Sequence, residues 1–268
     1  MLKICAIGDI VGKAGRNALN QLLPVIKKNH SPDIIICNGE NAAGGFGLTK
    51  KVFDELTKKI GVDVITMGNH WHDKPEIYNF APAQPNIVLP GNMGNVENLA
   101  DGMKILTSKN GIRYAVINLI GTAFMKPGNA CPFQAADELL SRIPQSVKVK
   151  IVDFHAEATS EKQALGHYLA ERVSLFYGTH THTPTADERV LKSHTAFATD
   201  VGMTGAYDSV IGIKKEASIA RFIGAGNKKF EPAKGDPWVC ALMAEIEPSS
   251  GKCANLQRLR LKLRDIKD

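Results

Sequence analysis

The sequence lacks a long apolar stretch, paired cysteines and any tract of low complexity. Its first residues form a short apolar run that Gly8 and Asp9 interrupt, so we expect neither a secretion signal nor a membrane span. The five cysteines show no C-x-x-C spacing, which argues against a disulfide framework, and we expect Cys5 and Cys37 to be buried in strands. These absences predict a cytoplasmic protein.

Aromatic residues are also few, at 6%, and the basic tail contains none. The tail alternates leucine with arginine or lysine, a period-2 pattern typical of a strand with one solvated face. We place on the apolar face Leu256, Leu259, Leu261 and Leu263, and on the charged face Arg258, Arg260, Lys262 and Arg264. The net charge of +6 suits an anionic substrate, but without interleaved aromatic residues the tail does not predict a nucleic-acid surface.

The remaining composition, with 44% hydrophobic residues, allows a well-packed core. Apolar runs, small polar loops and helical patterns alternate from the first residue, and this βαβ order predicts a largely parallel, buried sheet. The runs span residues 2–7, 34–37, 62–67, 149–154, 174–177 and 195–199. Hairpins are expected at residues 104–121, with Asn110 and Gly111 in the turn, and at residues 238–263. No linker interrupts the chain, so we predict one domain, residues 1–268.

Three helical patterns accompany these strands. Pro24 interrupts the first, which predicts a kink or a late start. A short amphipathic helix is expected around residues 52–60. Ser160 and Gln163 form a capping box for the third helix. On one face of that helix we expect Ala164, Leu165, Tyr168 and Leu169.

Polar side chains follow the predicted strands in both halves of the chain. They are Asp9, Glu40, Asn41, Asn69, His70, His155, His180 and His182. The carboxyl ends of parallel strands line the ligand crevice of an α/β sheet, so these side chains are predicted to meet. Each has an ordinary structural explanation alone: an isolated H-x-H is a weak signal, and an asparagine such as Asn69 often serves a turn. Their joint position at successive strand ends favours a metal site.

The types of donor atom limit which metals the site would bind. Histidine nitrogens with carboxylate and amide oxygens, and no thiolates, suit iron, manganese or zinc. Seven such donors are too many for one tetrahedral ion, whereas two ions sharing a bridging carboxylate accommodate them. The G-D-I-V-G-K run at residues 8–13 is not a nucleotide-binding P-loop, because its spacing is one residue short and Ala14 replaces the Ser or Thr that binds magnesium.

The strings G-N-H at residues 68–70 and G-T-H-T-H at residues 178–182 resemble the calcineurin-type metallophosphoesterase superfamily. GDIVG, NGENAAGGFGLT, ITMGNH, VDFHAEATSEKQALG, GTHTHTPTADER and TDVGMTGAYDSVIG are similar to its YmdB branch, from Met1 to about Phe222. This resemblance implies a layered α/β sandwich of sheets flanked by helices, with the metal site at the strand carboxyl ends. It also implies hydrolysis of 2′,3′-cyclic nucleotides to 3′-nucleotides, with a link to RNA turnover or signalling.

The resemblance assigns a role to each site residue. It implies one metal bound by Asp9, Asn41 and His182, a second bound by Asn69, His155 and His180, a bridging Glu40, and His70 as general acid. The implied metals are two iron ions, with manganese or zinc as alternatives. Val11 and Glu40 depart from the wider superfamily as the YmdB branch does. Trp71 and His72 depart from that branch, which continues G-N-H-T-W-D, and this departure leaves the substrate preference open.

Two other functions stay open. A metal amidohydrolase also pairs histidines with carboxylates, but there H-x-H ends the first strand, whereas here it comes late in the chain. A basic regulatory binding protein with a structural metal would not turn over bis-p-nitrophenyl phosphate, which a phosphodiesterase would. The sequence predicts no membrane partner and leaves a homo-oligomer open.

Overall fold

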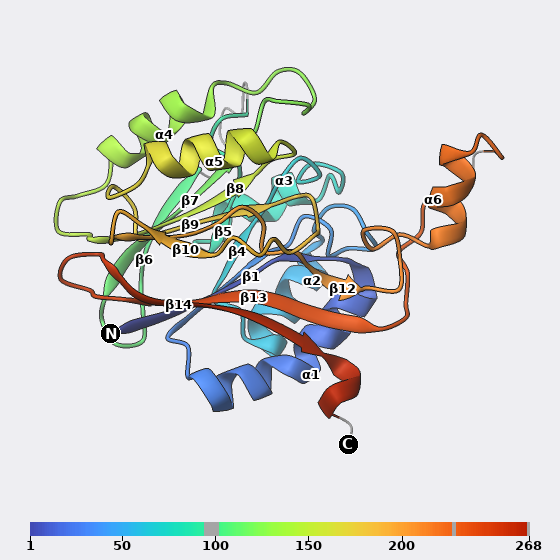
Figure 1. The fold of residues 1–268 in the computed structure, drawn as a ribbon, viewed down its shortest axis with the longest axis horizontal. Helices are drawn as coiled ribbons and strands as arrows, with labels where there is room; N and C mark the ends of the chain where they lie inside the picture. Colours follow the sequence, from blue (N-terminus) through green and yellow to red (C-terminus); the bar gives the residue numbers. More distant parts are fainter. Residues whose placement is uncertain (94–101, 227–228, 267–268) are drawn as a thin grey trace.

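The computed structural model describes residues 1–93, 102–226 and 229–266 and contains two sheets packed face to face, with helices on both outer sides (Figure 1). The predicted layered α/β sandwich is therefore confirmed. The first sheet contains β1 (Leu2–Ile7), β2 (Asp9–Ile10), β3 (Ile34–Asn38), β4 (Val64–Thr66), β5 (Ile87–Val88), β12 (Met203–Ala206), β13 (Pro237–Ile246) and β14 (Cys253–Lys262). The second contains β6 (Met103–Thr107), β7 (Arg113–Ile120), β8 (Val149–His155), β9 (Leu175–Thr179), β10 (Arg189–Leu191) and β11 (Thr195–Ala198).

The second sheet has a parallel centre with an antiparallel strand at each edge, whereas in the first sheet the parallel strands reach one edge and the antiparallel β13 lies between β12 and β1. The first has the order β2-β12-β13-β1-β3-β4-β5, with β14 also paired to β13, and its strands β1, β3, β4 and β5 are parallel. The second has the order β10-β11-β9-β8-β7-β6, and β7, β8, β9 and β11 are parallel. Both predicted hairpins form, as β6–β7 and β13–β14. Gly111 takes a φ of 77° in the first turn, a conformation that glycine adopts without strain.

Helices accompany both sheets. They are α1 (Gly12–His30), α2 (Lys50–Asp54) continued by the π-helix η1 (Glu55–Ile60), α3 (Ile77–Phe80), α4 (Pro132–Ser141), α5 (Thr159–Tyr168), α6 (Lys215–Phe222) and the 3-10 turns η2 (Ala81–Ala83) and η3 (Leu263–Ile266). In Figure 1, α1 and α2 lie against the first sheet, α4 and α5 against the second, and α6 projects from the body. The expected helix at residues 52–60 is thus present, with its second half wound as a π-helix.

Three apolar layers hold these elements together. On β1, Cys5 and Ile7 face the helical layer of the first sheet, whereas Ile4 and Ala6 face the layer between the sheets. This is the period-2 alternation of a strand. Because both faces are buried, the strand carries apolar side chains at nearly every position. A third layer lies between the second sheet and helices α4 and α5.

The predicted late start of the first helix and the predicted capping box of the third were wrong, while the alternative for the first helix, a kink at Pro24, stays a prediction. Helix α1 begins at Gly12 and contains Pro24, so it has no late start. Pro24 lies on the exposed face of α1, as does Asn20, so water can reach the carbonyl that loses its helical hydrogen bond. Helix α5 begins at Thr159 after an uncapped Ala158, and no Ser160 capping box forms.

The buried face of α5 also differs from the expected one. Leu165 and Leu169 are buried as predicted, but Ala164 and Tyr168 are exposed. Lys162 and Gly166 are buried in their place. The reason is tertiary: Gly166 packs directly on the Phe197 ring, and Lys162 forms an ion pair with the buried Asp200.

The basic tail is β14, and one leucine of its predicted apolar face was misplaced. Leu259, Leu261 and Leu263 pack towards α1, but Leu256 packs into the layer between the sheets. Leu256 is three positions before Leu259, and in a strand an odd offset places two side chains on opposite faces.

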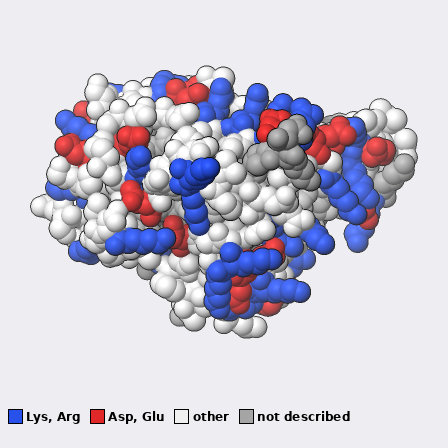
Figure 2. Space-filling view, turned by 90° about the horizontal axis from the view of Figure 1, so that it is seen from below, with Lys and Arg blue, Asp and Glu red and all other residues white. Residues whose placement is uncertain are grey.

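Several basic side chains of the tail contact other residues of the protein. Arg258 donates to the Thr185 carbonyl at 2.6 Å, and Arg260 and Lys262 lie over the Trp238 ring at 5.1 and 4.7 Å. On the face drawn in Figure 2, Lys and Arg alternate with Asp and Glu rather than forming one continuous basic area.

No helix in residues 1–93, 102–226 and 229–266 is both long and apolar enough to cross a membrane. The single domain spanning residues 1–268 stays a prediction, supported by the apolar layer that the two sheets share.

The packing of α5 gives a first test. A Cβ at Gly166 would overlap the Phe197 ring, so Gly166→Ala should lower the free energy of unfolding by about 1–3 kcal/mol. The matched control is Ala164→Ser on the exposed face of the same helix, which should change stability by no more than about 0.5 kcal/mol. Urea denaturation followed by circular dichroism measures both. Equal stabilities of the two variants would contradict the observed rotation of α5.

Candidate metal centre

The seven donors predicted from the sequence lie together where strands of both sheets end. The first sheet supplies Asp9, at the start of β2, and the loops after β3 and β4, which carry Glu40, Asn41 and Asn69. The second sheet supplies the remaining three. They are His155, the last residue of β8, and His180 and His182, directly after β9. The predicted donors therefore gather at strand carboxyl ends of two sheets rather than one.

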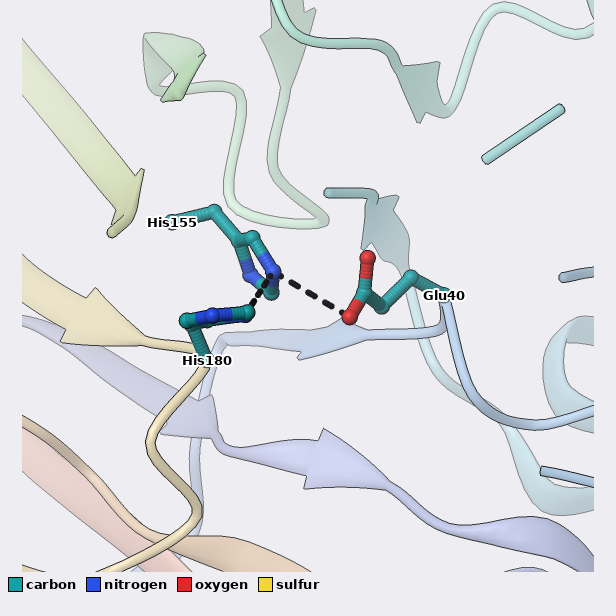
Figure 3. Close-up of side chains that lie close together, drawn as sticks. All are labelled: Glu40, His155 and His180. Atoms are coloured by element: carbon teal, nitrogen blue, oxygen red, sulfur yellow. Dashed lines mark hydrogen bonds and ion pairs between the residues drawn. The ribbon is translucent and has the colours of Figure 1, made fainter. Parts of the chain in front are cut away.

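The imidazole of His155 occupies the centre of this cluster. Its Nε2 atom lies 3.1 Å from Glu40 Oε1, 3.0 Å from Asn69 Oδ1 and 3.0 Å from His180 Nδ1. Figure 3 shows Glu40, His155 and His180 pointing towards one another from separate elements. Donor atoms of these three side chains all lie within 4.8 Å of each other, the spacing of a metal-binding group.

The other donors extend the cluster on the side of Glu40. Asn41 Nδ2 lies 3.0 Å from Glu40 Oε1 and 3.3 Å from His182 Nε2, and rotating this amide by 180° would present its oxygen instead. Asp9 Oδ2 accepts from the backbone N–H of His180 at 3.1 Å. Asp9 Oδ1 is buried and has no hydrogen-bond partner among the residues that the structure describes, and it lies 3.9 Å from His182 Nε2. A buried carboxylate oxygen without a partner is what a cation ligand requires.

Two further features fit divalent cations. A Cβ at Gly68 would overlap Glu40 Oε2 and His155 Nε2, so only glycine leaves room for the donors to converge there. Burial, together with repulsion from His155, lowers the pKa of His180 to about 3, which keeps its imidazole neutral and its lone pair free. Nitrogen and oxygen donors without thiolates suit iron, manganese or zinc.

The Glu40–His155 pair is a strongly coupled acid and base. Burial alone would raise the pKa of Glu40, but attraction to His155 and a hydrogen bond from it lower the pKa to about 2. Burial would likewise lower the pKa of His155, but Glu40, with Asp9 and Asp153, raises it to about 9. Without a cation, the imidazolium of His155 therefore neutralises part of the buried negative charge.

Sequence reasoning missed the polar groups behind His155. Thr179 Oγ1 accepts from His155 Nδ1 at 2.9 Å and donates to Asp153 Oδ1 at 2.7 Å. Asn38 Nδ2 donates to Asp153 Oδ2 at 3.2 Å. Burial raises the pKa of Asp153 to about 7. Such partners fix the orientation of a ligating imidazole. The signal was present, since Asp153 is a charged residue within the apolar strand IVDFH.

His70 lies at the edge of the donor cluster with one ring nitrogen already engaged. Its backbone N–H donates to Glu40 Oε2 at 2.9 Å, and its Nδ1 lies 2.8 Å from Asp73 Oδ2. Asp73 had no role in the predictions made from the sequence. The neighbouring Trp71 is only 5% exposed and packs edge-to-face on Tyr78, so it serves the core rather than the site.

A pocket opens beside His70 and has a largely apolar wall. The wall contains Val11, Phe46, Ile211, Ile213 and Phe230, and the donors Glu40, Asn41, His180 and His182 form its polar end. The backbone carbonyl of Ile211 lies 2.8 Å from His182 Nδ1, so the segment that leads into α6 orients this imidazole. Phe46 meets the His70 ring edge-on, with 5.2 Å between centroids.

The sequence and the fold are similar to those of known proteins. Residues 5–259 match the YmdB-like protein family. The chain is 42% identical over 258 residues to a 2′,3′-cyclic-nucleotide 2′-phosphodiesterase of Bacillus subtilis, covering 96% of both chains. It superposes on a crystal structure described as a novel phosphatase of Mycoplasma pneumoniae with a TM-score of 0.91 and 33% identity, covering 100% of this chain and 96% of the other. The calcineurin-like phosphoesterase YfkN of Bacillus subtilis shares the fold, with a TM-score of 0.56 and 15% identity over 98% and 91% of the two chains.

The raised pKa of His155 predicts how the stability of the metal-free protein depends on pH. A histidine whose folded pKa is about 9, above its ordinary 6.5, contributes stability fully below pH 6.5 and loses that contribution as the pH rises through 9. Chelator-treated protein should therefore melt at lower temperature as the pH rises from about 7.5 to about 9.5. His155→Gln should largely remove this slope in the same window. A wild-type melting temperature independent of pH there would show that His155 is not protonated in the metal-free fold.

Proposed function

Because this chain belongs to the YmdB-like protein family, we propose that it is a metal-dependent phosphodiesterase that hydrolyses 2′,3′-cyclic nucleotides to 3′-nucleotides. The observation that carries the proposal is the convergence of seven nitrogen and oxygen donors beside a histidine that faces an open pocket. A cytoplasmic role in RNA turnover or signalling belongs to the same proposal, and a homo-oligomer stays open.

The proposed metal ligands follow the two sides of the cluster. Asp9, Asn41 and His182 would hold one ion, Asn69, His155 and His180 the other, and Glu40 would bridge them. We propose iron, with manganese or zinc as alternatives, since all three accept this donor set. When bound, such ions supply Lewis acidity, lowering the pKa of water towards neutrality and offsetting charge on the phosphoryl oxygens.

His70 is the proposed general acid. The Asp73 carboxylate engages Nδ1 at 2.8 Å, which fixes the ring and leaves Nε2 as the nitrogen available to the substrate. The ring also lines the pocket. A ribose oxygen leaves poorly as an alkoxide. As a water oxygen bonds to the phosphorus and the P–O2′ bond breaks, a proton delivered from Nε2 lets the 2′ oxygen leave as a hydroxyl, which yields the 3′-phosphate.

The pocket wall suits a nucleoside. Phe46, Ile213 and Phe230 offer an apolar surface next to the donors, on which a base can pack while the phosphate lies at the polar end. A five-membered cyclic phosphate is strained, so positioning alone promotes its opening. Trp71, the aromatic departure from the family pattern, does not line this pocket, which leaves base contact to Phe46 and Phe230.

Two observations disfavour the rival functions, a metal amidohydrolase and a binding protein with a structural metal. The H-x-H pair follows β9 in the second sheet of a sandwich, not the first strand of a barrel, which disfavours a metal amidohydrolase. A purely structural metal needs no open pocket beside the donors, whereas this site has one. Turnover of bis-p-nitrophenyl phosphate with added manganese or iron separates the enzyme from a binding protein.

The acid role of His70 predicts a dependence on the leaving group. His70→Ala should retain metal but lose about 10²-fold or more of the turnover of 2′,3′-cAMP, with a clearly smaller loss for bis-p-nitrophenyl phosphate, because nitrophenolate leaves without a proton. His72→Ala is the matched control, since its more exposed side chain lies 3.8 Å from the same Asp73. Steady-state kinetics with both substrates decide the point. Equal losses for the two substrates would remove His70 from the acid role.

The substrate assignment is tested by product analysis. The enzyme should open 2′,3′-cAMP faster than 3′,5′-cAMP and release the 3′-nucleotide, because protonation at the 2′ oxygen makes that oxygen leave. Chromatography of both reactions against authentic 2′-AMP, 3′-AMP and 5′-AMP measures rate and product together. Release of 2′-AMP alone, or a preference for the 3′,5′ ring, would refute the substrate assignment while leaving phosphodiester hydrolysis intact.

A further inference from the structure

The loop that carries His180 and His182 has an unusual backbone. His180 has a φ of 94° and His182 a φ of 63°, both in the left-handed region that favours glycine. Two such residues separated by one position do not hold this shape by local preference, so the surrounding structure must impose it. The residue between them is Thr181.

Thr181 is bound by the carboxylate of Asp200, which follows β11 in the second sheet. Asp200 Oδ2 accepts from the Thr181 backbone N–H at 3.2 Å and from its hydroxyl at 2.7 Å. Asp200 Oδ1 accepts from the backbone N–H of Gly202 at 2.8 Å. The carboxylate is 1% exposed, so these bonds do not compete with bulk water. The Asp200 carboxylate therefore binds the loop midway between the two histidines.

Lys162 of α5 holds this carboxylate from the other side. Its Nζ donates to Asp200 Oδ2 at 2.7 Å, and the side chain is only 1% exposed. Its stem crosses β9 at Gly178, where a Cβ would lie 2.9 Å from Lys162 Cδ and would overlap the Thr199 carbonyl. The glycine of G-T-H-T-H is thus needed for the lysine to reach Asp200.

A buried ion pair contributes little to the free energy of unfolding by itself, because desolvation of both charges offsets their attraction. This pair also accounts for the rotation of α5 that places Lys162 inward. An asparagine at position 200 would have one acceptor oxygen for donors that now bind both oxygens of Asp200. The carboxylate is therefore matched to the set formed by Lys162, Thr181 and Gly202.

We propose that Asp200, anchored by Lys162, is a positioning residue that presets the His180–Thr181–His182 loop for metal binding. The inference rests on the proposed function, in which His180 and His182 bind different ions. Asp200 is not one of the seven donors and does not line the pocket. By fixing Thr181 it sets the backbone of both histidines at once, so that the cation need not order the loop when it binds.

The test isolates the contact with the loop and leaves the ion pair intact. Thr181→Val keeps the β-branched shape and removes the hydroxyl, and Thr181→Ser restores the hydroxyl. Thr183→Val is the matched control, because within the described part of the chain the Thr183 hydroxyl makes a single long hydrogen bond, to the Thr181 carbonyl at 3.5 Å. Each variant is stripped with chelator, its melting temperature is measured, and it is then titrated with manganese by calorimetry.

We expect Thr181→Val to bind manganese about tenfold or more weakly than wild type, as loss of a group that orients a ligand does elsewhere. Its metal-free melting temperature should stay close to that of wild type, while Thr181→Ser and Thr183→Val should bind as wild type does. Unchanged affinity in Thr181→Val, or an equal loss in Thr183→Val, would overturn the positioning role. Wild-type protein that binds no manganese, iron or zinc would instead overturn the metal site of the proposed function.

Discussion

The contact between the Glu40 carboxylate and the His155 imidazole ties the site to the fold. The two side chains come from different sheets, their donor atoms are 3.1 Å apart, and neither is more than 1% exposed. Charges buried this deeply are costly unless they are paired and hydrogen-bonded. The site therefore forms only when the two sheets pack in the observed register, so the donor cluster depends on the packing of the sheets.

This constraint explains why polar residues appear inside strands. The layer between the sheets is apolar over most of its length, through residues such as Ile36 and Ile151, and becomes polar towards the carboxyl ends of the strands. There Asn38 of β3 meets Asp153 of β8, and Thr179 connects Asp153 to His155. These groups orient the imidazole that the donors surround and satisfy one another where water is excluded.

Some residues of the site could be predicted from the sequence, and others could not. Asp9, Glu40, Asn69 and His155 follow apolar runs, and parallel strands place their carboxyl ends at one edge, so their meeting followed from order along the chain. The ion pair of Lys162 with Asp200 had no such signal, because nothing in the spacing of two residues on α5 and after β11 indicates that they meet. The face of α5 was misassigned for that reason: amphipathic periodicity assumes that lysine faces water, and here it does not.

By itself, the sequence predicted the buried parallel strands, both hairpins, three of the helices and the residues expected to act as donors, because these depend on local periodicity and on the position of polar residues after strands. It did not predict α3, α4 or α6. Only the tertiary structure decided that two sheets share the donors, that Leu256 faces away from the other tail leucines, and that His180 and His182 adopt left-handed backbone angles. Each of these depends on contacts between residues far apart in the chain, where the free energy of burying a charge or filling a space outweighs local preference.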